Sequence, residues 1–320
     1  MKNLKNYIKD YINENYLDES AWDIEDNVES DNKEFVLNEV KQFIKDNYPN
    51  ANPNSLTFVF DEEKEKYIVS TRGGLRLSTE AKSLTNGLFE WDAVKGWFDC
   101  SKWPITTLEG SPKIIGGYFD CHSCQESETL QGAPKTVSGD FDCYNCTKLT
   151  SLEGAPEITG SGFNCNGCAI TSLQGSPNKI KGDFVCSYCR ELTSLEGAPT
   201  VVKGDFLCRE CENLESFQGA PKIVAGCFYC NNCPSLKSLK GAPEKVGGFF
   251  CCYICNELTS LEGAPKTIGE YFDCHGCKKL ESLKGAPERV GGYFDCQNCP
   301  KLSSLDGIGK VKGGIFSDIK

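Results

Sequence analysis

The chain has 320 residues and is acidic, because its 45 Asp and Glu outnumber its 34 Lys and Arg and leave a formal net charge of −11. This balance argues against a general nucleic-acid-binding protein and against a protein of anionic membrane surfaces, since both need a basic footprint. Cysteine is the unusual component, with 21 residues against 2 His and 1 Met.

The first residues do not have the pattern of an export signal. Met1–Tyr16 carries Lys and Asp throughout and has no uninterrupted apolar core. No later stretch approaches the roughly 20 apolar residues of a membrane span. We therefore expect a cytoplasmic protein whose thiols stay reduced, and an odd number of cysteines also cannot pair off completely within one chain.

Residues 1–95 contain no cysteine and predict a small α+β domain. Apolar residues recur at helical spacing over Leu4–Tyr16 and again over Phe35–Ile44, and Pro49 ends the second helix. Leu56–Phe60 and Lys66–Thr71 predict two strands joined as a hairpin. This part of the sequence shows no phosphate loop, metal cluster or catalytic constellation.

From about residue 97 onward the sequence consists of copies of one repeat, each marked by a cysteine two positions after an aromatic residue. These anchor cysteines stand 21 or 22 residues apart. They are Cys100, Cys121, Cys143, Cys165, Cys186, Cys208, Cys230, Cys252, Cys274 and Cys296. A period of this length is typical of a solenoid, in which each copy forms one coil and stacks on its neighbours.

The spacing within one copy predicts which side chains form the core. Phe141 and Cys143 lie two positions apart and should face inward from a strand, which leaves Asp142 on the opposite face. Leu149 and Ile158 should return to the core from the rest of the coil. We therefore predict a solenoid over residues 96–320 with a parallel β-sheet on one face, and a C-terminal cap from about residue 306, where the repeat motif is lost.

These copies resemble the leucine-rich repeat in its short bacterial class. Phe141-x-Cys143-x-x-Cys146-x-x-Leu149-x-x-Leu152 is similar to the family pattern L-x-L-x-x-N-x-L-x-x-L, with Cys in place of the Asn and of a strand Leu. The L-E-G-A-P segment resembles the L-P-x-L-P stretch of secreted bacterial effectors, and L-T-S-L-E-G-A-P repeats resemble sequences of large bacteriophage genomes. The resemblance implies a bacterial host cell or a virion, and a partner bound on the strand face.

The nine C-x-x-C pairs leave three interpretations open. We predict structural thiols, because the cysteines form two continuous columns and Trp103 fills one of the positions. Zinc or an iron–sulfur cluster and adventitious disulfides are the alternatives. His122 and His275 each follow an anchor cysteine directly, so a Cys–His catalytic pair would have its members on opposite faces of a strand. We expect no catalytic residues, no metal site and no cofactor.

The strand face contains an apolar patch between two acidic ends. The residues predicted to bind a protein partner are Val185, Leu207, Tyr229, Phe249, Cys251 and Tyr253. The residues predicted to meet a basic partner or a cation are Asp99, Asp120, Asp142, Asp273 and Asp295. Like charges stacked about 5 Å apart would otherwise repel one another.

Three functions follow from these patterns. The first is a non-enzymatic solenoid that binds a protein on its strand face. The second is a structural or accessory component of a larger assembly, such as a phage particle. The third and least favoured is a zinc or redox protein. Nucleic acid and membranes are not expected as partners.

Overall fold

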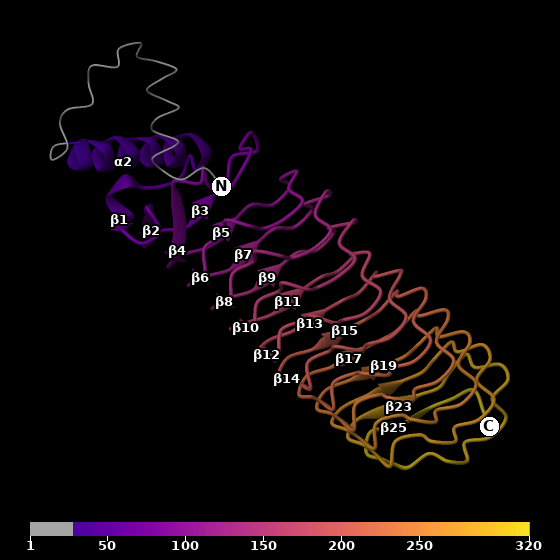
Figure 1. The fold of residues 1–320 in the computed structure, drawn as a ribbon. Helices are drawn as coiled ribbons and strands as arrows, with labels where there is room; N and C mark the ends of the chain where they lie inside the picture. The colour runs from indigo at the N-terminus through magenta and orange to yellow at the C-terminus, as the bar shows by residue number, and fades with distance from the viewer. Residues whose placement is uncertain (1–27, 320) are drawn as a thin grey trace.

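The computed structural model describes residues 28–319. These residues form a continuous solenoid, a stack of coils that begins under helix α2 (Val28–Asn47) and extends without interruption to the end of the described chain (Figure 1). The predicted first helix, Leu4–Tyr16, lies outside the described residues. Among the described residues, no helix is long and apolar enough to cross a membrane.

Helix α2 covers the first coil of the solenoid. Val36, Val40, Ile44 and Tyr48 recur every fourth residue and are buried on one side, as the sequence predicts for the second helix. Tyr48 contacts the Phe98 ring at a centroid distance of 6.1 Å and donates a hydrogen bond to the Leu84 carbonyl over 2.7 Å. The helix thus closes the end of the core that the first coil would leave open to water.

The predicted hairpin is confirmed and is joined to the solenoid. Strand β1 (Leu56–Asp61) pairs antiparallel with β2 (Lys66–Thr71), after a short 3-10 turn η2 (Pro53–Ser55). Strand β2 pairs in parallel with β4 (Phe89–Val94), and β3 (Leu75–Arg76) pairs with the first repeat strand. Hydrogen-bonded sheets therefore cross the boundary predicted at residue 95, so residues 56–94 are the beginning of the same stack.

Each coil contributes one strand to each of two parallel sheets, whereas the sequence predicted a single sheet. We call the 12-stranded one the aromatic sheet, because its strands contain the buried phenylalanines. Besides β3, its strands are β5 (Phe98–Asp99), β7 (Phe119–Asp120), β9 (Phe141–Asp142), β11 (Phe163–Asn164), β13 (Phe184–Val185), β15 (Phe206–Leu207), β17 (Phe228–Tyr229), β19 (Phe250–Cys251), β21 (Phe272–Asp273), β23 (Tyr293–Asp295) and β25 (Gly314–Phe316).

We call the 13-stranded sheet the aliphatic sheet, because Val or Ile fills most of its buried positions. After β1, β2 and β4, its strands are β6 (Ile114–Ile115), β8 (Thr136–Val137), β10 (Ile158–Thr159), β12 (Lys179–Ile180), β14 (Val201–Val202), β16 (Ile223–Val224), β18 (Lys245–Val246), β20 (Thr267–Ile268), β22 (Arg289–Val290) and β24 (Lys310–Val311).

The core is built from columns of identical side chains. Phe141, Cys143, Cys146 and Leu149 are all buried, as predicted. The phenylalanine rings of successive coils stack face to face, for example with centroids 5.2 Å apart between Phe119 and Phe141. Because this distance is close to the spacing of hydrogen-bonded strands, ring stacking and backbone pairing are satisfied together.

One inward position was predicted wrongly. Ile158 is 37% exposed, and its neighbour Thr159 is fully buried. Strand register decides this, because Thr159 lies opposite the buried Val137 of the preceding coil. The Thr159 hydroxyl donates to the Ser161 carbonyl over 3.5 Å, which lets a polar side chain occupy this core position.

The segment predicted from about residue 306 to be a cap continues both sheets instead. Strand β24 pairs with β22, and β25 pairs with β23, both in parallel. Ile315 and Phe316 are 43% and 47% exposed on the last strand. Among residues 28–319, no further strand pairs with β24 or β25 on the side away from β22 and β23.

The turn between the two cysteines of each coil requires a left-handed backbone. Gly167 and Gly276 occupy the turn position before the second cysteine, with φ of 70° and 69°. Asn145, Asn232 and Asn298 occupy it in other coils with φ of 57° each. Ile254 has φ 58° at the same position, although a β-branched residue is strongly disfavoured there.

We expect Ile254→Asn to stabilise the chain by about 1 kcal/mol, because Asn tolerates the left-handed region and Ile does not. Denaturant unfolding of both proteins measures the difference. Ile158→Asn is the matched control, since Ile158 is 37% exposed against 38% for Ile254 but lies in an extended strand. A lower stability of Ile254→Asn would show that the Ile side chain contributes more contact than its backbone strain removes.

Candidate functional site

The aromatic sheet brings the predicted site residues together in one outward column. Asp99, Asp120 and Asp142 lie directly opposite one another in β5, β7 and β9. Val185, Leu207, Tyr229 and Cys251 follow in the same register, and Asp273 and Asp295 complete the column. Asn164 separates the first group from the second. The apolar patch between acidic ends is therefore a continuous surface, which we call the aromatic-sheet face.

The side chains of the apolar patch are less exposed to solvent than the sequence predicted. Val185, Leu207 and Tyr229 are half-buried, and Cys251 is only 9% exposed, because its small side chain lies between the larger Tyr229 and Asp273. The two other predicted residues are held by ring stacking. Phe249 stacks on Tyr271 with centroids 4.8 Å apart, and Tyr253 stacks on His275 at 4.8 Å. Such a surface is preformed and rigid.

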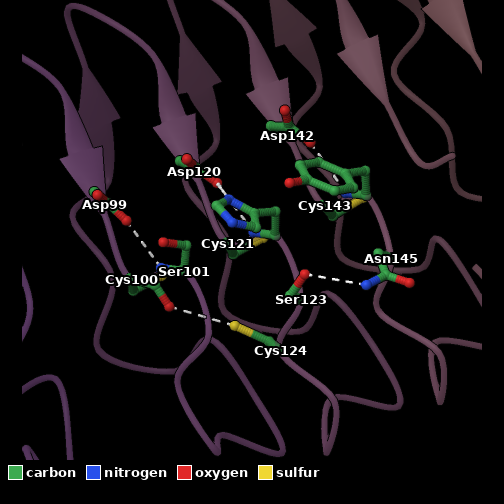
Figure 2. Close-up of polar contacts among 12 residues, drawn as sticks. Asp99, Cys100, Ser101, Asp120, Cys121, Ser123, Cys124, Asp142, Cys143 and Asn145 are labelled. Carbon is green, nitrogen blue, oxygen red and sulfur yellow. Dashed lines mark hydrogen bonds and ion pairs between the residues drawn. The ribbon is translucent and has the colours of Figure 1, made fainter. Parts of the chain in front are cut away.

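The aspartates of the column have a structural role that the sequence analysis missed. In each case one carboxylate oxygen accepts a hydrogen bond from the backbone N–H two residues later, at 3.0 Å for Asp120 and for Asp142 and 2.9 Å for Asp295. The side chain thereby turns the chain out of the strand (Figure 2). The recurring Asp or Asn before the anchor cysteine was the available signal, and Asn164 makes the same bond over 3.1 Å.

The apolar patch consists of the coils that lack this turn bond. Val185, Leu207 and Tyr229 cannot accept the N–H from the second residue after them, although the rest of the coil motif is unchanged. Behind Val185, the Ser187 hydroxyl is buried without a hydrogen-bond partner. These coils therefore give up a local stabilising contact and present apolar side chains to solvent.

The electrostatics of the first acidic end differ from residue to residue. Burial acts to raise the pKa of Asp99, but hydrogen bonds from Ser101 and the Arg76 guanidinium at 2.8 Å outweigh it and lower that pKa. Burial, and then the negative charge of Asp120, raises the pKa of Asp142 despite the bond from the Tyr144 N–H. Asp142 is thus the carboxylate whose ionised form the fold disfavours.

At the second acidic end, two carboxylates and an imidazole converge. One ligand atom each from Asp273, His275 and Asp295 lies within 4.8 Å of the others, the one such group of potential metal ligands in residues 28–319. His275 Nδ1 is 2.7 Å from the Asp273 carboxylate. Oxygen and imidazole ligands of this kind suit divalent zinc or manganese.

The cysteines form a hydrogen-bonded column inside the core. The second cysteine of each pair donates its S–H to the carbonyl of the first cysteine one coil earlier, over 3.3 Å from Cys146 to Cys121 and 3.2 Å from Cys168 to Cys143. Figure 2 shows the same bond from Cys124 to Cys100. Each cysteine side chain thus links the turn of its own coil to the backbone of the coil before it.

Neither histidine is placed to activate a cysteine. Cys121 faces the core and is 2% exposed, while His122 points outward and contacts Asp120 over 2.7 Å. Burial raises the pKa of the Cys121 and Cys274 thiols well above the ordinary value, and neighbouring sulfurs add to the effect. The arrangement favours packing over nucleophilic chemistry.

No family model matches the chain, and no curated protein matches it either. Among solved structures it is similar to a leucine-rich repeat protein from Bacteroides ovatus ATCC 8483, with 13% sequence identity and a TM-score of 0.34, over 83% of this chain and 90% of that one. The fold described above, a leucine-rich-repeat-like solenoid, follows from the strands and the buried columns of this chain itself.

We expect Asp142→Asn to stabilise the chain at neutral pH. The folded-state pKa of Asp142 is raised, so folding favours its protonated form and stability falls as pH rises through that pKa. Asn keeps the turn bond, as Asn164 shows, and removes the charge. Denaturant unfolding at acidic and neutral pH should give a gain at neutral pH alone; a gain that is equal at both would contradict the electrostatic origin.

We expect Cys227 to be the first thiol modified in the native chain, because it is half-buried while the other described cysteines are buried. Reaction with a chromogenic disulfide reagent should show one fast phase and a slow remainder that reacts on unfolding. Cys227→Ser should remove the fast phase, and Cys211→Ser should leave it. Fast modification of many thiols would contradict a closed core.

Proposed function

We propose that this chain is a non-enzymatic solenoid that binds a protein partner on the middle of its aromatic-sheet face. The observation that supports this most is the loss of the strand-end turn bond in consecutive coils, where Val185, Leu207 and Tyr229 replace Asp or Asn. Loss of the turn bond costs stability, and it occurs in the coils that present apolar side chains to solvent. Binding of a partner to these apolar side chains would account for that loss. Preformed apolar patches on a protein surface are typical of interfaces.

The surroundings of the patch indicate the chemistry of the partner. Gly162 occupies a position that other coils fill with larger side chains, and it leaves a depression lined by Asp140, Asp142, Asn164 and Val185. A lysine or arginine side chain would fit this acidic depression beside the apolar patch. We therefore propose a partner with apolar residues at its centre and basic residues toward its ends, in keeping with the aspartates on both sides of the patch.

The resemblance of the repeats adds two finer proposals. A bacterial host cytoplasm is the proposed location, and membership of a larger assembly is the second candidate function. Among residues 28–319 no observation favours an enzyme or a redox protein, and the group of Asp273, His275 and Asp295 is the one that bears on zinc.

The double variant Leu207→Asp with Tyr229→Asp should weaken partner binding at least tenfold, since an unpaired charge in the centre of an interface is costly to desolvate, by roughly 1.4 kcal/mol or more. Thr193→Asp with Thr259→Asp is the matched control, because both threonines are exposed on the leucine-containing arm of the coil. Quantitative mass spectrometry of proteins captured from the native cell extract measures the effect.

The patch variant should lose the captured proteins that wild type and control retain. Capture of the same proteins by all three chains would contradict the proposed surface. Loss by the control alone would place the interface on the leucine-containing arm.

A further inference from the structure

The outward surface of the aliphatic sheet is basic, although the chain as a whole is acidic. We call this surface the aliphatic-sheet face and define it by the two residues before and the one residue after the inward residue of each strand from β6 to β24. Its cationic residues are Lys113, Lys135, Lys179, Lys181, Lys203, Lys222, Lys245, Lys266, Arg289, Lys310 and Lys312. Its acidic residues are Glu157, Glu244 and Glu288.

The aromatic-sheet face has the opposite charge. Its outward carboxylates are Asp99, Asp120, Asp140, Asp142, Asp183, Asp205, Asp273 and Asp295, and its permanent cations are Arg76, which pairs with Asp99, and Arg209. The leucine-containing arm is the third side of the coil. There Lys and Glu of adjacent coils pair with each other, for example Lys279 with Glu257 over 2.7 Å and Lys237 with Glu215 over 3.2 Å. Charge is therefore balanced on one side of the stack and separated on the two sheets.

Few cations of the aliphatic-sheet face are neutralised within the described residues. The ion pairs on this face are Lys113 with Glu90 at 3.5 Å and Lys266 with Glu288 at 3.9 Å. Lys203, Lys222 and Lys245, in the middle of the face, have no ion pair in the described part of the chain. Their positive charge is available to a partner.

Two central coils are apolar on both faces. Val201 and Ile223 are 42% and 44% exposed on the aliphatic-sheet face. They belong to the same coils as Leu207 and Tyr229 of the aromatic-sheet face, six residues further along the chain. Ile114 and Ile158 are also exposed on the aliphatic-sheet face, so its apolar residues extend beyond these two coils.

The two faces also share one repeat distance, because every coil contributes one strand to each sheet. Rows of lysine on one face and rows of aspartate on the other therefore recur at the same interval, about 4.8 Å per coil. A partner of unrelated fold would match this interval only by coincidence. A second copy of this chain matches it along the whole length of the stack.

We propose that the aliphatic-sheet face of one copy docks on the aromatic-sheet face of a second copy. This rests on the proposed function, since it names the partner of that surface as another copy of the chain. The two contacting surfaces differ, so the contact is heterologous and each bound copy keeps one free face of each kind. Lateral arrays of parallel solenoids follow, rather than a closed dimer, and salt should dissolve them because the facing charges are screened.

Sedimentation velocity of the reduced full chain, over a range of concentration and salt, tests this. Wild type should form species larger than a dimer at low salt and dissociate as salt is added. Lys203→Glu with Lys222→Glu and Lys245→Glu reverses the charge of the basic face, and Leu207→Lys with Tyr229→Lys places positive charge in the centre of the aromatic-sheet face, where it repels the facing lysines. Each variant alone should raise the dissociation constant at least tenfold, and circular dichroism with the slow thiol reaction shows that each is folded.

Mixing the two variants separates this contact from any other. One keeps its aromatic-sheet face and the other keeps its aliphatic-sheet face, so the mixture should associate at concentrations where each variant alone stays monomeric. The control Thr193→Asp with Thr259→Asp should associate as wild type does.

Three results would overturn the inference. They are a wild-type chain that stays monomeric at every concentration and salt, association that persists in both face variants, and lysine-dependent binding of single-stranded DNA by a chain that does not self-associate. If wild type is monomeric while Leu207→Asp with Tyr229→Asp still abolishes capture of other proteins, the proposed function stands and only this inference fails.

Discussion

Backbone hydrogen bonds between successive coils hold this molecule together, because no coil can bury its own phenylalanine, cysteines and leucines. The amide groups of Phe141, Cys143 and Asn145 donate to carbonyls of the following coil over 3.1, 2.8 and 2.7 Å. Because the repeat length is nearly constant, these bonds align equivalent positions of successive coils. Each side chain therefore lies against the equivalent side chain of the next coil. The stacked rings, the thiol column and the leucine rows all depend on this alignment. Helix α2 covers the first coil, which has no coil before it.

This division between core and surface explains how the outward face acquires a binding role. Inward positions repeat because they must stack, and a different residue there would leave a gap or a clash in two neighbouring layers. The outward position before each anchor cysteine is constrained by the turn bond that residues such as Asp120 and Asp142 make. Where Leu207 and Tyr229 replace this residue, backbone pairing between coils keeps the strand in place, so the surface can change without loss of the fold.

The aliphatic sheet gathers lysines on one side of a chain whose net charge is negative. The formal charge of −11 describes an average over all sides of the stack and conceals a basic surface. Because lysines such as Lys203 and Lys222 follow or precede a buried residue of the aliphatic sheet, they all emerge on one side. A solenoid separates charge in this way whenever a charged type recurs at a fixed position in its repeat.

The period, the inward Phe and Cys positions, the hairpin and helix Phe35–Ile44 follow from the sequence, because each depends on spacing along a few neighbouring residues. The apolar patch could also be located, since its column needs nothing more than the repeat register. The second sheet, the burial of Thr159 in place of Ile158 and the turn role of Asp142 could not be derived. They depend on which strand lies opposite which and on where a backbone N–H points, and those are set by the stacking of one coil on the next.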